Sequence, residues 1–386
     1  MVRKANEEGP AMPDVRPHLR LFLGGDLMTA RGIDQILPNP GDPLLHEAYV
    51  THAGDYVALA ERRNGPIPRP VDFAYVWGVV PQVLARHRPD VSLVNLETAV
   101  TRGGWPQPKG INYRMEPNNL PVLGAVKLDC CSLANNHVLD WGEAGLLDTL
   151  AALDHLGLGH AGAGVDRRSA TAPAVLPVVG GRRLLVFAFA TPDCGVPSEW
   201  SADDRQPGVA WLSELSPRSL NRIATRIRAL KRPGDRVLVS LHWGGNWDFS
   251  IPTEQVRFAH GLIDEAGVDL VHGHSSHHVK GIEVYHRRLI LYGCGDLLDD
   301  YEGIDGYASY RSDLGLLYFP SLDAKGNLLS LLLYPTHQCR LSIQAAEDSD
   351  RVWLLDTLQR ECARFGCSVI PTANDLFRLV WREARH

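Results

Sequence analysis

Four histidines lie close together in the second half of this 386-residue chain. The stretch HGHSSHH (272–278) directly follows the apolar run VDLV and contains His272, His274, His277 and His278. Imidazole nitrogens are frequent ligands of zinc, manganese and iron in proteins. If the apolar run continues as a strand, His272 and His274 share one of its faces, whereas His277 and His278 lie in the following loop. We therefore expect only part of this cluster to reach one metal ion.

Other apolar runs also end in polar side chains that bind metals in proteins. Asp26 follows the first run, Asn95 and Glu97 end the second, and His242 ends a later one. In α/β sheets, side chains just past the carboxyl ends of the strands meet at one edge. A glutamate directly after an apolar run is costly to bury unless it is paired or bound to a metal. This mixed set of oxygen and nitrogen ligands predicts one or two divalent ions, with Mn, Fe or Zn as the candidates.

The motif NNHVLD (135–140) follows another apolar run, LDCCSL. One of its two asparagines is explained if it caps the helix that follows, because asparagine is a preferred N-cap residue. That explanation leaves His137 without a structural role. A histidine beside a metal cluster can act as a general acid or stabilise a developing oxyanion. We therefore predict that His137 and Asp140 are catalytic residues.

The apolar runs alternate with segments of helical periodicity. Strands are expected over the ranges 19–25, 90–97, 128–135, 183–190, 236–244, 268–274 and 288–296. Helices are expected over 141–156, 215–231 and 253–266. Near-continuous apolar runs are typical of strands that are buried on both faces, and strands that alternate with helices indicate an α/β fold.

Three segments lie outside this alternation. Residues 1–18 are polar and rich in proline, so we expect a flexible N-terminal segment before a catalytic domain at 19–340. The stretch 36–70 contains many prolines and glycines and is expected to be a long surface excursion. From residue 341, leucines and Trp353 recur at helical spacing, which predicts a helical C-terminal appendage over 341–386 that packs on the main domain.

The composition narrows the classes of partner. The chain has 45% apolar and 22% charged residues and a formal net charge of −6, with no basic stripe for a nucleic-acid backbone. The first apolar run is too short to span a bilayer, and no signal-peptide h-region follows the polar N-terminus. The seven cysteines are scattered without CxxC spacing, which favours reduced thiols. These features predict a cytoplasmic protein without a membrane span or a nucleic-acid partner, and they leave the oligomeric state open.

An anionic substrate would need hydrogen-bond donors beside the metals. Arg31 follows the first predicted ligand closely, and Lys109 and Arg114 lie in a loop rich in proline and glycine, where they could grip a phosphate or carboxylate. The alternative is that these cations are solvated surface side chains. The predicted substrate contacts are Arg31, Asn95, Lys109, Arg114 and His278.

The order of these motifs resembles that of a known family. The chain contains GD-x-M at 25–28, NLE at 95–97, NNH-x-x-D at 135–140, HWG at 242–244, and then a histidine-rich GH loop followed by IE. This order resembles the poly-γ-glutamate capsule synthesis (CapA-type) family, and the resemblance covers roughly residues 19–320. That family is similar in fold to the calcineurin-like metallophosphoesterases, which implies an α/β fold built as a layered α/β/β/α sandwich.

The resemblance also implies a set of metal ligands. Asp26 matches the first metal aspartate, and Glu97 takes the place of the bridging carboxylate. His137 matches the histidine near the reacting group. The remaining implied ligands are Asn136, His242, His274 and His277.

Two positions depart from the family patterns. Met28 stands where metallophosphoesterases carry a histidine, as is usual in the capsule family, so one ligand of the first ion is missing. Ser275 falls where the first histidine of an H-P-H loop is expected, so His274 must substitute from one residue earlier. His272 is then expected to be structural or to support a ligand. These departures are compatible with a single or weakly bound ion.

Three functions remain open. The leading one is a metal-dependent, phosphoesterase-like hydrolase in which metal-activated water attacks a small or polymeric anionic substrate. The second keeps the site but acts on the γ-glutamyl amide bonds of poly-γ-glutamate, or serves the synthesis or processing of another polyanion. The third is a non-catalytic metal-binding scaffold, in which Met28 and Ser275 mark a decaying site.

Overall fold

The computed structural model describes residues 18–304, 306–372 and 374–382. Helices and strands are mixed along the chain and build two large sheets, which confirms the predicted α/β class. The predicted N-terminal segment, 1–18, lies outside the described residues except for His18. Of the described helices, none is long and apolar enough to cross a membrane.

The larger sheet has ten strands and is centred on the first predicted strand. Strand β1 (Leu19–Leu27) runs parallel to β2 (Val91–Leu96) and antiparallel to β16 (Leu314–Leu322). The sheet continues past β2 with β5 (Cys130–Ser132) and β6 (Gly159–Ala161), and past β16 with β17 (Leu328–Gln338), β20 (Phe377–Trp381) and β19 (Cys367–Pro371). Two short strands pair at its side, β15 (Asp296–Leu298) with β1 and β18 (Ile343–Ala345) with β17.

The smaller sheet has six strands, four of them parallel. Its order is β13 (Ile282–Tyr285), β14 (Arg288–Leu291), β12 (Leu270–His274), β11 (Arg236–His242), β9 (Arg182–Ala190) and β8 (Ala174–Val178). The strand predicted over 288–296 is wrong as a single element, because β14 belongs to this sheet and β15 to the larger one. The chain crosses between the sheets through Gly293 and Gly295, and Gly295 has a φ of 75°.

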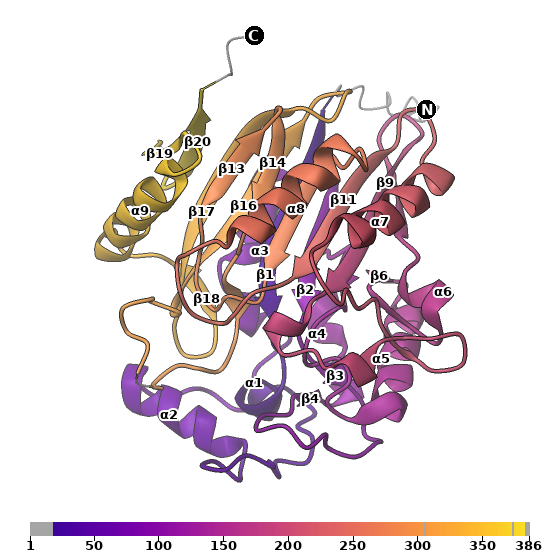
Figure 1. The fold of residues 1–386 in the computed structure, drawn as a ribbon. Coiled ribbons are helices and arrows are strands. Elements are labelled where there is room, and N and C mark those ends of the chain that lie inside the picture. The colour runs from indigo at the N-terminus through magenta and orange to yellow at the C-terminus, as the bar shows by residue number, and fades with distance from the viewer. Residues whose placement is uncertain (1–17, 305, 373, 383–386) are drawn as a thin grey trace, which may run out of the picture.

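Alternating side chains of the smaller sheet enter two different cores. Leu184 and Val186 of β9 belong to a buried cluster that also contains Leu21 and Leu93 of the larger sheet. Leu185 lies in a second cluster with apolar residues of α7 (Pro217–Leu230) and α8 (Thr253–Asp264), which lie over the other face (Figure 1). Burial on both faces explains why these strands are almost continuously apolar.

The other described helices and strands surround these sheets. The three predicted helices correspond to α7, α8 and α5 (Gly142–Leu156). The remaining helices are α1 (Arg31–Ile36), α2 (Gly54–Asn64), α3 (Val80–His87), α4 (Pro121–Gly124), α6 (Arg167–Ala170) and α9 (Asp348–Ala363). The remaining strands are β3 (Ala99–Val100), β4 (Arg114–Met115), β7 (Ala163–Gly164) and β10 (Gly208–Val209).

Two predictions for the outlying segments need correction. The stretch 36–70 is not only a surface excursion, because it contains α2, whose Tyr56 and Val57 are buried. The described part of 341–386 is not purely helical, because it contains β18, β19 and β20 besides α9. Strand β20 pairs with β17, so this part of the chain extends the larger sheet. Trp353 and the leucines Leu354, Leu355 and Leu358, which indicated a helix, all lie in α9.

Candidate metal centre

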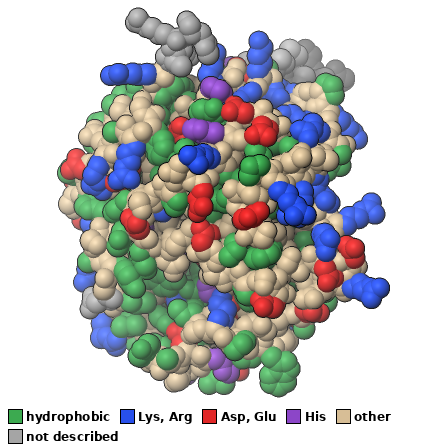
Figure 2. All heavy atoms as spheres, viewed as in Figure 1, with side chains coloured by type: hydrophobic (Ala, Val, Ile, Leu, Met, Phe, Trp, Pro, Cys, Tyr) green, Lys and Arg blue, Asp and Glu red, His purple; other side chains and the backbone are tan. Residues whose placement is uncertain are grey.

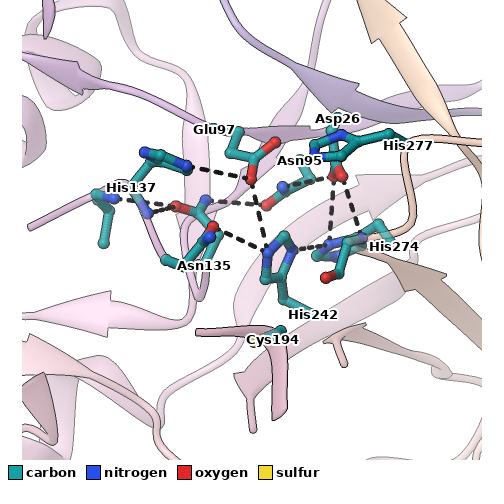
Figure 3. Close-up of polar contacts among 12 residues, drawn as sticks. Asp26, Asn95, Glu97, Asn135, His137, Cys194, His242, His274 and His277 are labelled. Atoms are coloured by element: carbon teal, nitrogen blue, oxygen red, sulfur yellow. Dashed lines mark hydrogen bonds and ion pairs between the residues drawn. The ribbon is translucent and has the colours of Figure 1, made fainter. Parts of the chain in front are cut away.

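The carboxyl ends of strands from both sheets meet at one buried edge (Figure 3). Asp26, near the end of β1, lies in register with Asn95 of β2 and with Asp296 of β15. In the smaller sheet, His242 at the end of β11 is in register with His274 at the end of β12. The larger sheet therefore supplies oxygen ligands and the smaller sheet supplies imidazoles.

Two groups of these side chains have the spacing of a metal site. Asp26, His242 and His274 form what we call the first ligand group, and Asp26, His277 and Asp296 form the second. Within each group, one ligand atom per residue lies within 4.8 Å of the others. Asp26 belongs to both groups and is therefore positioned as a shared carboxylate, as in the two-ion sites of many hydrolases.

One assignment of tautomers to its histidines satisfies the hydrogen bonds around the first ligand group. His242 Nε2 lies 3.1 Å from Asn136 Oδ1, an acceptor, so Nε2 carries the hydrogen. His272 Nε2 likewise donates to the Gly24 carbonyl, so Ser240 donates its hydroxyl to His272 Nδ1. Ser240 Oγ can then accept from His274 Nε2, 2.8 Å away. His272 thus has the structural role that was expected, and both ligand histidines keep a lone pair on Nδ1.

These two lone pairs face each other. Nδ1 of His242 lies 2.8 Å from Nδ1 of His274, which is itself 3.5 Å from Asp26 Oδ1. Burial lowers the pKa of both histidines well below its usual value, so the rings are neutral at pH 7. Two lone pairs this close repel each other unless a cation lies beside them. The donor set of the first ligand group therefore fits a divalent metal ion.

The second ligand group contains a residue that the sequence analysis did not select. His277 Nδ1 lies 3.0 Å from Asp296 Oδ1, and Asp296 stands beside Asp26 in the sheet. A Cβ atom on Gly25 would lie 1.7 Å from the Gly295 carbonyl oxygen, so only glycine permits this close approach of β1 and β15. Each aspartate directly follows one of these glycines. That repeated Gly-Asp pair is the signal that could have identified Asp296.

The carboxylate of Asp26 is held from two sides. Asn95 Nδ2 donates to its Oδ1 at 2.8 Å, and the Ser275 backbone N–H donates to its Oδ2 at 3.0 Å. Ser275 has a φ of 100°, a strained conformation for a residue with a side chain, and this conformation directs its N–H to the aspartate. Asn95 was predicted to contact substrate, but the structure places its amide on Asp26.

The buried carboxylates are poorly compensated by cations of the protein itself. Burial, reinforced by the charge of Asp296, raises the pKa of Asp26 to about 7. Burial also raises the pKa of Asp296 to about 7. Glu97 has a pKa well above its usual value, first because it is buried and then because Asp26 lies near. A bound divalent cation would reverse these shifts by neutralising the cluster.

Glu97 and Asn136, two further predicted ligands, border the first ligand group. Glu97 Oε1 lies 3.6 Å from His242 Nε2, and Asn136 Oδ1 binds the same nitrogen. Asp26 is the carboxylate shared by both ligand groups, and a bridging role for Glu97, which belongs to neither group, stays a prediction. Met28 offers no ligand at the position where metallophosphoesterases carry a histidine, and Asp296 on the neighbouring strand belongs to the second ligand group.

His137 and Asp140, the predicted catalytic residues, form a buried pair beside these groups. His137 Nδ1 lies 2.6 Å from Asp140 Oδ2, and its ring stacks on Tyr113 with centroids 3.8 Å apart. Burial lowers the pKa of His137 to about 4. The hydrogen on Nδ1 faces the carboxylate, so Nε2 is left as a free acceptor, 4.0 Å from Glu97 Oε1.

The predicted substrate cations are engaged with protein groups. Lys109 Nζ lies 2.8 Å from Asp140 Oδ1 and therefore supports the His137–Asp140 pair. Arg31 is buried and forms ion pairs with Asp300 and Glu47. The guanidinium of Arg114 packs over the Trp141 ring. Among the described residues, these cations therefore hold structure, and a contact with substrate stays a prediction for them.

A cleft of about 690 Å³ opens beside the second ligand group. Its lining includes His277 and Asp299 together with Trp247, Tyr301 and Tyr307. The rings of Trp247 and Tyr307 stack with centroids 3.9 Å apart. His278, predicted to face substrate, instead packs among the rings of Trp247, Phe249 and Tyr310 and does not line this cleft.

Comparison with known proteins agrees with this geometry. The profile described as "Bacterial capsule synthesis protein PGA_cap" matches residues 20–301. The chain belongs to this bacterial capsule synthesis family. A protein of Mycobacterium tuberculosis named probable polyglutamine synthesis accessory protein is 46% identical over 95% of this chain and 97% of its own length. All ligands of both groups fall within the part of the chain that the family profile matches.

More distant members of the capsule synthesis family match about half of the chain. PGA biosynthesis protein CapA of Bacillus subtilis is 28% identical over 50% of this chain and 48% of its own length. Capsule biosynthesis protein CapA of Bacillus anthracis is 31% identical over 50% of this chain and 45% of its own length. A solved Plasmodium chain, GAP50, the anchor in the inner membrane complex, aligns with a TM-score of 0.37 and 10% identity, a likeness too weak to support an argument.

Proposed function

We propose that this capsule synthesis family protein is a metal-dependent hydrolase of an anionic substrate. Its catalytic domain, residues 19–340, would be a layered α/β/β/α sandwich of the metallophosphoesterase type. The observation that carries the proposal is the sharing of Asp26 by two ligand groups next to the His137–Asp140 pair. A binding scaffold would have no need for a buried general base at this position.

The residues divide the chemistry between them. A divalent cation in the ligand groups would polarise the scissile group and acidify a water molecule. His137 is neutral at pH 7 and can accept a proton from the attacking water at Nε2. Asp140 holds the ring through Nδ1 and stabilises the positive charge that the ring then acquires, and Lys109 holds Asp140. The protonated ring can return the proton to the leaving group.

We infer that the substrate is a polyanion of the polyglutamate type, cleaved at γ-glutamyl amide bonds. The names of the family and of one relative support this substrate, since they refer to PGA_cap and to PGA biosynthesis. A phosphoester is the second candidate, because the order of the ligand motifs is similar to that of the metallophosphoesterases. Both substrates carry anionic groups, and the hydrolysis of either one needs a general base that activates water.

The experiment compares the two substrates on one metal-reconstituted protein. The protein is stripped with a chelator, reloaded with Mn, Fe or Zn, and incubated with poly-γ-glutamate or with 4-nitrophenyl phosphate. We expect metal-stimulated release of glutamate oligomers. His137→Ala should lower turnover by about two to four orders of magnitude, the usual contribution of one general base, while bound metal stays unchanged. Absence of metal-stimulated hydrolysis of both substrates would exclude the hydrolase and favour the scaffold.

A further inference from the structure

A second polar surface lies on the outer face of the smaller sheet, away from the ligand groups. A groove of about 370 Å³ runs between α6 and α7, and its lining includes Arg167, Arg222 and Arg226. A second groove, of about 510 Å³, continues from it along the C-terminal half of α7. Arg226 lines both grooves and therefore joins them. We call this joined surface the basic trough.

The basic trough is lined by cations without carboxylates. The second groove adds Arg168, Arg183, Lys231 and Arg232 to the arginines of the first. Among the described residues, no aspartate or glutamate lines either groove. Figure 2 shows Lys and Arg side chains gathered over α7 and α6. The whole chain carries a formal net charge of −6, so this concentration of positive charge is local.

Several of these cations lack an ion-pair partner. Arg183 pairs with Asp235, Lys231 Nζ lies 3.6 Å from Asp269, and Arg167 Nε lies 3.9 Å from Asp204. In the described structure, Arg168, Arg222, Arg226 and Arg232 have no carboxylate within ion-pair distance. Arg226 Nε is also buried without a hydrogen-bond partner. Guanidinium groups held side by side repel each other, and a bound anion would remove that repulsion.

The trough follows β9 for most of its length. Arg183 and Leu185 line the second groove and Phe189 lines the first, and these alternating residues share one face of the strand. Six residues of strand span about 20 Å. Ala190, at the end of β9, is in register with His242 of the first ligand group. One end of the trough therefore lies at the strand edge that carries the ligand groups, on the opposite face of the sheet.

We propose that the basic trough binds a linear polycarboxylate chain, one end of which would reach the strand edge that carries the ligand groups. This inference rests on the proposed function, because the polymer is the proposed substrate. A small anion would fill only part of a surface this long, whereas a polymer presents carboxylates at regular intervals. Arginine forks match carboxylate geometry, so they recognise such a chain without reading its sequence.

The test uses charge reversal on exposed, unpaired arginines. Arg222→Glu combined with Arg232→Glu changes the trough, and the matched control combines Arg62→Glu with Lys325→Glu at exposed positions elsewhere. Binding of fluorescently labelled poly-γ-glutamate is measured by anisotropy at several salt concentrations. We expect the trough variant to bind at least about tenfold more weakly and with a smaller salt dependence, and the control to bind like the unaltered protein.

Three outcomes would contradict either the trough as a binding site or the polycarboxylate as its ligand. Equal binding by the trough variant and the unaltered protein would exclude the trough, as would an equal loss in the control. Tighter, trough-dependent binding of a labelled single-stranded RNA would replace the polycarboxylate with a nucleic acid. Cleavage of a short γ-glutamyl tripeptide tests the proposed hydrolase separately from the proposed trough, because this cleavage needs the metal centre but not the trough. Trough-dependent binding without any cleavage would retain the trough and reject the hydrolase.

Discussion

The two ligand groups share Asp26 but are built in different ways. The first draws His242 and His274 from adjacent parallel strands of the smaller sheet, so it forms only when the two sheets pack face to face. The second takes Asp296 from a strand paired with β1 and His277 from a loop. The first group therefore depends on tertiary packing, whereas the second depends on strand pairing and on the local path of one loop.

The donor atoms of the two groups differ as well. The first group offers two neutral imidazoles and one carboxylate, and the second offers one imidazole and two carboxylates. Imidazole-rich sites suit zinc and iron, while carboxylate-rich sites suit manganese and other harder ions. We therefore expect the two positions to differ in ion preference, and variants of the ligands should separate them.

The largest effect is expected from the shared ligand. Asp26→Asn removes the carboxylate charge from both groups while keeping the side-chain volume, so both ions should be lost together with all metal-stimulated hydrolysis. The measurement is elemental analysis of the purified variant after equilibration with metal. Asp42→Asn, at an exposed carboxylate, is the matched control and should retain full metal content. One ion remaining in Asp26→Asn would show that the carboxylate is not shared.

A smaller and selective effect is expected from the ligands that are not shared. His242→Ala should remove the ion of the first group only, and His277→Ala the ion of the second only, because each histidine belongs to one group. Metal titration followed by calorimetry should then show one binding event in place of two. If either variant lost both ions, the two ligand groups would not bind their ions independently, and the difference inferred between them would be contradicted.

The sequence predicted the first ligand group better than the second, for physical reasons. His242 and His274 end apolar runs, and parallel strands bring such residues to one edge, so the pattern alone indicates them. Asp296 lies within a run that was read as one strand, and nothing local shows that the chain leaves one sheet for the other at Gly293–Gly295. Its role depends on the approach of Gly25 to Gly295, a contact between distant parts of the chain.

The same reason explains the errors elsewhere. Helical periodicity from residue 341 indicated α9, but strand β20 is identified by its pairing with β17 and β19. Arg31 was assigned to substrate because it follows Asp26, while its partners Asp300 and Glu47 lie elsewhere in the chain. Residue type and spacing therefore predicted which strands carry ligands. Ion pairs between distant parts of the chain decide which of the remaining charged side chains are available to bind a substrate.

The dependence of metal affinity on pH should also distinguish the groups. The pKa of Asp26 and of Asp296 is raised to about 7 by burial, so these carboxyls bind protons as the pH falls through 7 and compete with the metal. The second group contains both carboxyls and the first contains only Asp26. The histidines of the first group, whose pKa is lowered by burial, do not compete in this range.

Affinity should therefore fall on acidification at both positions, and more steeply at the second. Each competing proton lowers the logarithm of the affinity by up to about one per pH unit. Metal titrations of His242→Ala and His277→Ala between pH 8 and pH 5 isolate one position at a time. A steeper slope for the first group, or no slope at either, would contradict the assignment of the raised carboxyl pKa values to the ligands.

The smallest effect is expected from a residue that supports the shared ligand. Asn95→Ala removes the hydrogen bond to Asp26 Oδ1, and loss of such a supporting bond typically weakens metal binding about 10–100-fold. Oδ1 is the oxygen 3.5 Å from His274 Nδ1, whereas Oδ2 keeps the bond from the Ser275 N–H. The loss should therefore be larger at the first group than at the second in metal titrations. As the control, Asn118→Ala at an exposed position should leave the metal affinity of both groups unchanged. An equal loss of affinity at both groups in Asn95→Ala would mean that Asn95 positions the whole carboxylate of Asp26 and not one oxygen.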